Sequence, residues 1–350
     1  QSILIKISYC DMDTLGRKDY PEIVILGEQS IAKIFFLRAL RFSTHGEFYI
    51  DKDSINFLPS LTPHYHLVSD LIEKKAKYRF DFFGKNFLIN KQQTLAHTKN
   101  IYHAKLKCLS NDANFEFIMN ADKSIEYICS ETIDGRIEHN YISSNDILLP
   151  AELLSSLSPG DVISLEKSHI KGKYRVYINL FSERWDCYRS IGINIPLLVL
   201  QVLLGRNVST LPLVDFKNLI CQSTTISKRK NLSLPHILWF DLDETLICRW
   251  KPITEMLSFL KKCVLNGHDI RLLTRHTFNI EETLKKIDLT INHFSKIIVI
   301  SKDQKKSEFV KRSHGFIDNE FAERFDVRTN IRAFVMDLDQ IDYVAFDKEF

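Results

Sequence analysis

Two acidic residues, Asp241 and Asp243, follow an apolar run in the stretch HILWFDLDETLICRW at residues 236 to 250. A carboxylate is ionised at neutral pH, so Asp241 could attack a phosphoryl group without a separate activating base. Asp243 could protonate the leaving oxygen and later accept a proton from the hydrolytic water, if burial near other carboxylates raises its pKa. The pair alone is equally compatible with an acidic turn, so its interpretation depends on the residues that meet it.

Three further features have suitable chemistry for phosphoryl transfer. Thr274 ends the apolar run DIRLLT, Lys305 and Lys306 begin the stretch KKSEFV, and Asp318 ends the run GFID. The threonine hydroxyl can hydrogen-bond a phosphoryl oxygen, and one of the two lysines can neutralise charge beside the nucleophile. The sequence favours Lys306 because it directly precedes the serine, and Lys305 remains the alternative.

Clustered acidic groups also require a cation. The carboxylate of Asp241, the backbone carbonyl of Asp243 and the carboxylate of Asp318 supply hard oxygen ligands. Such ligands suit Mg²⁺, which accepts few protein ligands and keeps several waters. We therefore expect Mg²⁺ as the cofactor.

An alternation of strands and helices beyond residue 235 is expected to position these groups. Several of the strands are nearly all apolar, which is typical of a Rossmann-like parallel sheet with helices on both faces. The carboxyl ends of parallel strands meet at one edge, so the candidate residues should gather there. The predicted strands are 236–241, 269–274, 296–300, 315–318 and 332–338, and the predicted helices are 253–266, 280–287, 304–312 and 319–325.

The four motifs FDLDETL, LLT, KKS and FIDN resemble, in this order, those of the haloacid dehalogenase superfamily of phosphatases and phosphotransferases. The resemblance covers about residues 235 to 345 and implies an aspartyl-phosphate intermediate on Asp241 and dependence on Mg²⁺. One departure is Asn319 after Asp318, where the fourth motif often carries two acids. A similar Asp-Asn pair occurs in the small protein phosphatases of the superfamily, so metal binding is still expected.

The spacing of the motifs leaves no room for an inserted cap domain. There are 28 residues between Thr245 and Thr274 and 30 between Thr274 and Lys305, enough for one helix and one strand each. A capless site is open to solvent. We therefore expect a large phosphorylated substrate, or a lid supplied by the N-terminal region, a partner or another subunit.

Three other residue pairs after or near predicted strands are given simpler interpretations. Asp337 and Asp339 repeat the acidic spacing and are interpreted as solvated turn residues, and Arg275 and His276 as loop residues or contacts for a substrate anion. The early pair Asp11 and Asp13 is interpreted as a structural turn, with a metal-nucleotide site of a sugar transferase as the alternative.

The chain is expected to divide into an N-terminal domain at 1–225, a linker at 226–234 and a C-terminal domain at 235–350. The N-terminal sequence predicts an α/β or α+β fold, although its apolar residues follow no decisive helix or strand period. Its predicted strands are 2–8, 22–26, 115–121, 125–130 and 174–180, and its predicted helices are 28–40, 65–76 and 195–204.

Residues 112 to 205 are similar to the end of an ATP-grasp ligase domain. Asn179 and the run GINIP match that family's metal-binding and helix-entry motifs, but Tyr177 stands where the family has a metal-binding glutamate. A tyrosine cannot supply the lost negative charge. The resemblance therefore implies a degenerate ligase domain used for substrate recognition or as a lid.

Composition narrows the class of protein. The formal net charge of +3 in 350 residues does not indicate a nucleic-acid binder, and the basic groups at 74–79 and 228–230 are interpreted as a helix end and a linker. The longest apolar stretch, 193–205, is too short for a membrane helix. The seven cysteines form no zinc pattern, and we expect a reduced, cytoplasmic setting. The oligomeric state is not indicated.

The sequence thus predicts a Mg²⁺-dependent phosphatase that acts on a phosphomonoester. Two alternatives remain at this point. One is an ATP-dependent ligase with an accessory C-terminal domain, and the other is a binding protein whose phosphatase site has lost activity.

Overall fold

The computed structural model describes residues 22–41, 43, 47–57, 65–67, 76–83, 86–89, 105–106, 113–122, 124–133, 136–140, 147–148, 151–167, 174–182, 184–206, 208 and 232–346. The segment 232–346 is continuous and carries the predicted phosphoryl-transfer residues. The predicted strand at 2–8, the acidic pair at 11–13, the basic run at 228–230 and most of the expected linker lie outside the described residues.

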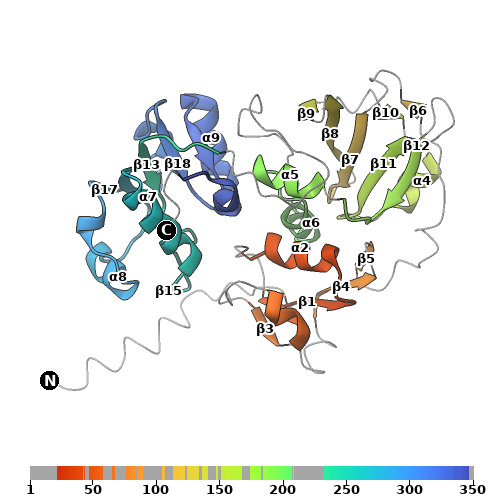
Figure 1. Cartoon of the computed structure of the whole chain (residues 1–350), viewed down its shortest axis with the longest axis horizontal. Helices are drawn as coiled ribbons and strands as arrows, with labels where there is room; N and C mark the ends of the chain where they lie inside the picture. The colour runs from red at the N-terminus through yellow and green to blue at the C-terminus, as the bar shows by residue number, and fades with distance from the viewer. Residues whose placement is uncertain are drawn as a thin grey trace.

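The C-terminal part is an α/β fold around a five-stranded parallel sheet, as predicted (Figure 1). Its strand order is β17-β16-β13-β18-β19, so the first strand in sequence is the central one. The strands are β13 (Ile237–Phe240), β16 (Asp269–Thr274), β17 (Lys296–Val299), β18 (His314–Ile317) and β19 (Phe334–Met336). The helices are α7 (Thr254–Leu265), α8 (Ile280–Lys286) and α9 (Phe321–Ile331), with short 3₁₀ helices η4 (Ile291–His293), η5 (Lys306–Glu308) and η6 (Leu338–Tyr343).

The central strands of this sheet are covered on both faces, which explains their largely apolar character, whereas the edge strand β17 is partly exposed. Leu238 and Phe240 of β13 pack on one face with residues of α7 and α8, whereas Trp239 packs on the opposite face with Val327 of α9. Within 232–346, the chain between β13 and β16 contains only α7 and the hairpin formed by β14 (Ile247–Cys248) and β15 (Lys251–Pro252). The predicted absence of an inserted cap domain is consistent with these elements.

A second parallel arrangement lies near the start of the described chain. Its strand order is β3-β2-β1-β4-β5, with the first four strands parallel and β5 antiparallel to β4. Its core joins the sheet to one layer of helices, in which Phe36 of α2 packs with Trp185 of α5 and Val199 of α6. The strands are β1 (Glu22–Gly27), β2 (Glu47–Ile50), β3 (Tyr65–Leu67), β4 (Tyr78–Phe83) and β5 (Asn86–Ile89), and the helices are α2 (Ile31–Ala39), η1 (Lys52–Phe57), α5 (Arg184–Ser190) and α6 (Ile195–Leu203).

An antiparallel sheet with the strand order β12-β11-β7-β8-β9 completes the N-terminal region. The strands predicted at 115–121 and 125–130 are present and pair with each other. The elements are β7 (Ala113–Met119), β8 (Ile125–Ile133), β9 (Arg136–Asn140), β11 (Val162–Lys167), β12 (Tyr174–Ile178) and α4 (Ala151–Ser156), beside a small pair formed by β6 (Lys105–Leu106) and β10 (Ile147–Leu148).

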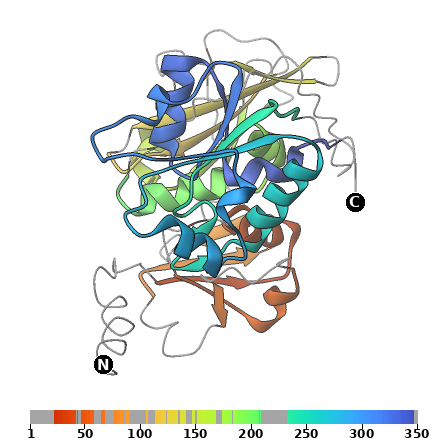
Figure 2. The same ribbon diagram turned by 90° about the vertical axis from the view of Figure 1, so that its left-hand side faces the viewer.

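Polar contacts link the N-terminal helices to the C-terminal part. Arg189 of α5 donates a 3.2 Å hydrogen bond to Asp339 Oδ1 of η6, and Gln340 donates to the carbonyl of Ser190. Asn194, which caps α6, also donates to Asp339. Figure 2 shows the red and orange ribbon of residues 22–89 below the green and blue ribbon of the C-terminal part.

The interpretation of Asp337 and Asp339 as solvated turn residues is wrong. Asp339 is only 4% exposed because it pairs with Arg189, and Asp337 is largely covered because it pairs with Arg324. Their partners lie far away in the sequence or on another element, so the local pattern does not reveal them.

Two predicted helices are also wrong in part. Residues 65–67, expected to begin a helix, form strand β3 because they pair with β2. The helix predicted at 304–312 is reduced to η5, in which Lys306 and Ser307 are buried. The other predicted C-terminal helices and strands are present, although α9 continues to Ile331, six residues beyond the predicted end of that helix. Among the described residues, no helix has both the length and the apolar character needed to cross a membrane.

Candidate active site

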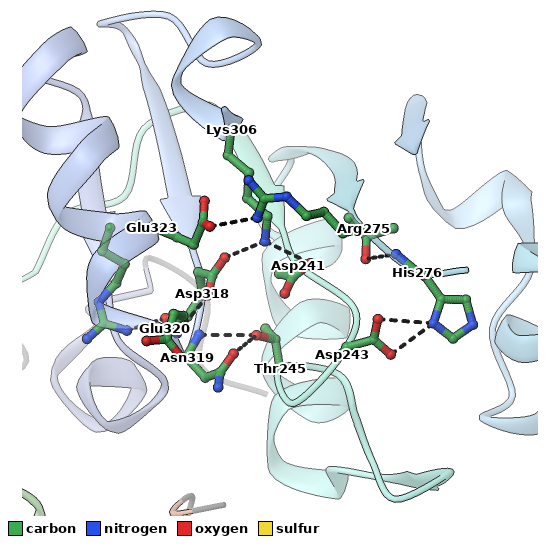
Figure 3. A network of polar contacts seen from close by, with 12 residues as sticks. Asp241, Asp243, Thr245, Arg275, His276, Lys306, Asp318, Asn319, Glu320 and Glu323 are labelled. Atoms are coloured by element: carbon green, nitrogen blue, oxygen red, sulfur yellow. Dashed lines mark hydrogen bonds and ion pairs between the residues drawn. The ribbon is translucent and has the colours of Figure 1, made fainter. Parts of the chain in front are cut away.

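The candidate residues gather at the carboxyl edge of the C-terminal sheet, beyond its central strand β13 (Figure 3). The chain proceeds from β13 to β16 and β17 on one side and then to β18 and β19 on the other. This reversal makes the end of the central strand the topological switch point of the sheet, which is where ligands bind in open α/β sheets. Asp241 N donates to Ile317 O at 3.0 Å, so β13 and β18 remain paired up to the two acidic residues that follow them.

The loop that carries the first motif is fixed by apolar and polar anchors. Leu242 and Leu246 are fully buried, and both Leu246 N and Ile247 N donate to the carbonyl of Leu242. Thr245 Oγ1 accepts a hydrogen bond from Asn319 N at 3.2 Å and donates to Asn319 Oδ1 at 3.3 Å. The fourth motif is thereby joined to the first through Asn319.

Lys306 lies between the acidic residues of the first and fourth motifs. Its ammonium group is 3.1 Å from Asp241 Oδ1 and 2.7 Å from Asp318 Oδ2, and its side chain is 3% exposed. Lys305 is different, because its side chain is 68% exposed and its ammonium group lies 3.9 Å from Asp326. The geometry therefore favours Lys306 over Lys305 as the cation beside Asp241.

Burial and charge shift the pKa values of this cluster. Burial, followed by repulsion from Asp318, raises the pKa of Asp241 to about 7, although the nearby Lys306 opposes the change. Burial alone would lower the pKa of Lys306, but the carboxylates of Asp318 and Asp241 outweigh it and raise that pKa. Lys306 therefore remains an ammonium ion, while ionisation of Asp241 calls for additional positive charge.

Asp318 is held by groups on α9 and at its start. Its Oδ1 accepts from Glu320 N at 2.7 Å, and its backbone carbonyl accepts from Arg324 at 2.6 Å. The same guanidinium donates to Asp337 Oδ2 at 2.6 Å. Arg324 thus fixes the ends of β18 and β19 to each other.

Asp243 faces outward on the opposite side of the loop and is held by a buried histidine. His276 Nδ1 lies 2.9 Å from Asp243 Oδ1, and His276 Nε2 lies 2.9 Å from Thr283 Oγ1 on α8. The Asp243 side chain is 48% exposed, so it can be reached from solvent. A carboxylate that is both oriented and accessible is well placed to exchange a proton with a bound molecule.

Thr274 ends β16 and is fully buried beside β13. Its Oγ1 accepts a hydrogen bond from His276 N at 3.1 Å, which leaves its hydroxyl hydrogen available to another acceptor. Arg275 donates to Glu323 at 2.6 Å and to the Gln304 carbonyl at 2.8 Å, so it connects the loop after β16 with α9.

The acidic groups fit a divalent cation. Asp241 Oδ1 is buried and contacts the Lys306 ammonium group at 3.1 Å, and Asp318 provides a second buried carboxylate that shares the same ammonium group. One ammonium group neutralises only part of the charge of this pair. Among the described residues, no three or more His, Cys, Asp and Glu side chains form a metal-binding group. The expected set has two such side chains and a backbone carbonyl, the small number of protein ligands typical of Mg²⁺.

Two residues have roles at the site that the sequence does not predict. His276 is expected from the sequence as a loop residue or an anion contact, and the sequence predicts no role for Arg324. The position of His276, two residues after a predicted strand end, was the available signal. Nothing local distinguishes Arg324 from an ordinary helix residue.

Asn179, the candidate metal ligand in the N-terminal region, is occupied within its own sheet. Its Oδ1 accepts from Val162 N, and its Nδ2 donates to Asp161, both at 2.9 Å.

No model of a known protein family matches this sequence, and neither does any curated protein.

Proposed function

We propose that the protein is a Mg²⁺-dependent phosphatase of the haloacid dehalogenase type, which hydrolyses a phosphomonoester through an aspartyl-phosphate on Asp241. The observation that carries this proposal is the position of Lys306 between Asp241 and Asp318 at the carboxyl edge of a parallel sheet. Structural ion pairs also occur at such edges, but here Asp243 follows Asp241 on the same loop and Thr274 ends the strand that pairs with β13. A nucleophile, a cation, an acid and a hydroxyl donor therefore come from the same edge of the sheet.

In the first step, an Asp241 carboxylate oxygen attacks phosphorus and the bond from phosphorus to the ester oxygen breaks. Asp243 supplies a proton to that ester oxygen, so the alcohol leaves as a neutral molecule. Thr274 donates to a phosphoryl oxygen, and Lys306 neutralises charge beside the nucleophile.

In the second step, a water molecule attacks phosphorus in the aspartyl-phosphate, and Asp243 removes a proton from that water. Inorganic phosphate forms and Asp241 is regenerated as a carboxylate. His276 holds the Asp243 carboxylate in one orientation through both steps.

Asp241, Asp318 and the backbone carbonyl of Asp243 would hold Mg²⁺. The cation would supply positive charge to the phosphoryl oxygens and would favour ionisation of Asp241. The two buried carboxylates of Asp241 and Asp318, which share a single ammonium group, support this assignment.

We propose that the N-terminal region selects or covers the substrate, because the C-terminal part carries no inserted cap. Residues 112 to 205 resemble the end of an ATP-grasp domain, but Tyr177 stands where that family has an acidic ligand and the Asn179 amide is used within the sheet. Among the residues that the structure describes, no contact favours ligase chemistry over hydrolysis.

The full chain should release phosphate from p-nitrophenyl phosphate when Mg²⁺ is present and not when it is chelated. Asp241→Asn should abolish the release, and Lys305→Gln, at an exposed lysine, should retain it. Absence of release from any ester in a broad panel, with folding verified, would favour a binding protein without hydrolytic activity.

A further inference from the structure

An aromatic cluster adjoins the proposed acid. We define the aromatic cluster as Trp250, His276 and Phe278. The Trp250 and Phe278 rings are 4.9 Å apart between centroids, and His276 lies 5.9 Å from Trp250 and 5.6 Å from Phe278. The histidine of this cluster is the residue that contacts Asp243.

The two large rings of the cluster face solvent rather than the core. Trp250 is 37% exposed and Phe278 is 52% exposed, whereas His276 is 4% exposed. Exposed aromatic rings beside a reactive group lose contact with water when a planar ligand covers them. Single exposed apolar residues are common, but here two form edge contacts within one cluster next to a proposed proton donor.

The backbone that presents Trp250 is strained. Arg249 and Trp250 occupy the two-residue turn between β14 and β15 with φ values of 49° and 63°. Such a turn favours Asn and Gly, because a bulky residue with positive φ is costly. Backbone strain of this kind is concentrated at ligand-binding sites, where the benefit of a precisely placed side chain outweighs the conformational cost of the backbone.

Charge adds a second feature to the same surface. Lys286 of α8 places its ammonium group 5.2 Å from the centre of the Trp250 ring. This side chain is exposed. Because this ammonium group lies over one face of the Trp250 ring, a planar ligand would either displace it or stack on the opposite face, with positive charge close by in both cases.

The proposed mechanism fixes which part of a substrate meets the cluster. Asp243 protonates the ester oxygen, so the departing alcohol lies on its side of the phosphoryl group. Beyond the Asp243 carboxylate come first the His276 ring and then the exposed rings of Trp250 and Phe278. A planar group one sugar away from the ester oxygen would reach the exposed rings.

We propose that the aromatic cluster binds the ring of the leaving group and that the substrates are phosphomonoesters with a nucleoside-like alcohol. The inference rests on the proposed phosphatase function for the placement of the phosphoryl group. It assigns to Trp250 and Phe278 the recognition of a planar ring, which the phosphoryl-transfer residues do not provide.

Binding can be measured separately from hydrolysis because the chain contains three tryptophans, of which Trp185 and Trp239 are buried and Trp250 is exposed. Adenosine 5′-monophosphate should quench the tryptophan fluorescence of Asp241→Asn with Mg²⁺, and ribose 5-phosphate should not. Phe278→Ala in the same background should weaken the nucleotide affinity by about tenfold, the loss expected for one base-stacking contact. Phe325→Ala, at an exposed ring on α9 that stacks on Phe321, should leave the affinity unchanged.

In the otherwise unaltered enzyme, kcat/KM should be higher for adenosine 5′-monophosphate than for ribose 5-phosphate. Trp250→Ala should reduce this ratio by about tenfold, and Trp250→Phe should restore most of it. Equal quenching by the two phosphates, or equal kcat/KM values for them, would overturn the aromatic subsite while leaving the phosphatase intact. Nucleotide quenching without hydrolysis of any ester would support the subsite and contradict the proposed phosphatase.

Discussion

At the scale of single residues, the two neighbouring lysines provide a sharp comparison. Lys306 is buried against two carboxylates, and Lys305 is exposed. Lys306→Gln should lower kcat by about a hundredfold or more, since it removes the charge beside the nucleophile. Lys305→Gln should stay within about twofold of the unaltered enzyme, as expected for an exposed lysine. Equal losses in the two variants, measured as phosphate release at saturating substrate, would contradict this assignment.

In the proposed mechanism, His276 is a positioning residue that acts through its contact with Asp243. Loss of its hydrogen bond should matter most when the leaving oxygen needs a proton, as it does in a sugar phosphate. His276→Ala should therefore lower kcat for ribose 5-phosphate by about tenfold, within the range of a general-acid contribution. The loss should be smaller for p-nitrophenyl phosphate, whose phenolate leaves readily. A purely structural role would lower both rates to the same extent.

The sequence indicated the candidate reactive residues of the site better than the residues that hold them in place. Asp241, Lys306 and Asp318 were recognisable because each follows or precedes a strong apolar signal. His276 was ambiguous because a lone histidine after a strand has no local pattern that separates a positioning role from a loop role. Its partner Thr283 lies on the next helix, beyond the reach of strand-end spacing.

At the scale of elements, β18 positions Asp318 by packing tightly against β13. A Cβ atom added at Gly315 would lie 2.6 Å from Leu238 Cδ2, and Leu238 is fully buried. Gly315→Ala should therefore destabilise the protein by about 1 to 3 kcal/mol through overpacking. Urea denaturation would measure this loss, and unchanged stability would mean that Leu238 can move aside.

Gly267 offers a matched control for that experiment, because a Cβ atom there meets nothing within 4 Å. Its positive φ of 84° suits asparagine better than most other residues. Gly267→Asn should change the free energy of unfolding by less than about 1 kcal/mol. A loss as large as that of Gly315→Ala would show that removal of any glycine from this domain has the same effect.

The parallel strands could be predicted because both faces of the sheet are covered, which makes their sequences apolar throughout. The helix predicted at 304–312 is wrong, because Lys306 and Ser307 are buried at the site and only the short η5 forms there. The hairpin at 247–252 was missed because its turn contains Arg249 and Trp250 in place of the usual Asn and Gly.

At the scale of the whole molecule, Asp339 connects the two parts of the chain. Burial raises its pKa to about 6, although Arg189 and Arg41 oppose the change. An acid with a raised pKa in the folded state binds its proton more tightly there than when unfolded. Its contribution to stability is therefore full below pH 3.8 and is lost as the pH rises through about 6.

Asp339→Asn should remove this dependence. The quantity to compare is the free energy of unfolding of the unaltered protein minus that of Asp339→Asn. This difference should fall by up to about 3 kcal/mol between pH 4 and pH 7, because each unit of pKa shift corresponds to roughly 1.4 kcal/mol. Urea denaturation at several pH values would measure it. A constant difference across this range would mean that Asp339 titrates normally in the folded protein.

This connection was hidden from the sequence for a physical reason. Asp339 is separated from Arg189 by 150 residues, and an acidic residue after a strand is usually solvated. Only the packing of η6 against α5 and α6 brings the charges together. The same contacts join the C-terminal sheet to the region that we propose selects or covers the substrate.

The claim that Asp241 is the nucleophile is tested most directly by chemical trapping of the intermediate. The full chain would be incubated with Mg²⁺ and a hydrolysed phosphomonoester, quenched, and treated with borohydride, which reduces an aspartyl-phosphate to homoserine. Peptide mass spectrometry should find homoserine at position 241 and at no other aspartate, and none in Lys306→Gln above background. Homoserine at another position, or continued phosphate release without modification of Asp241, would contradict the proposed mechanism.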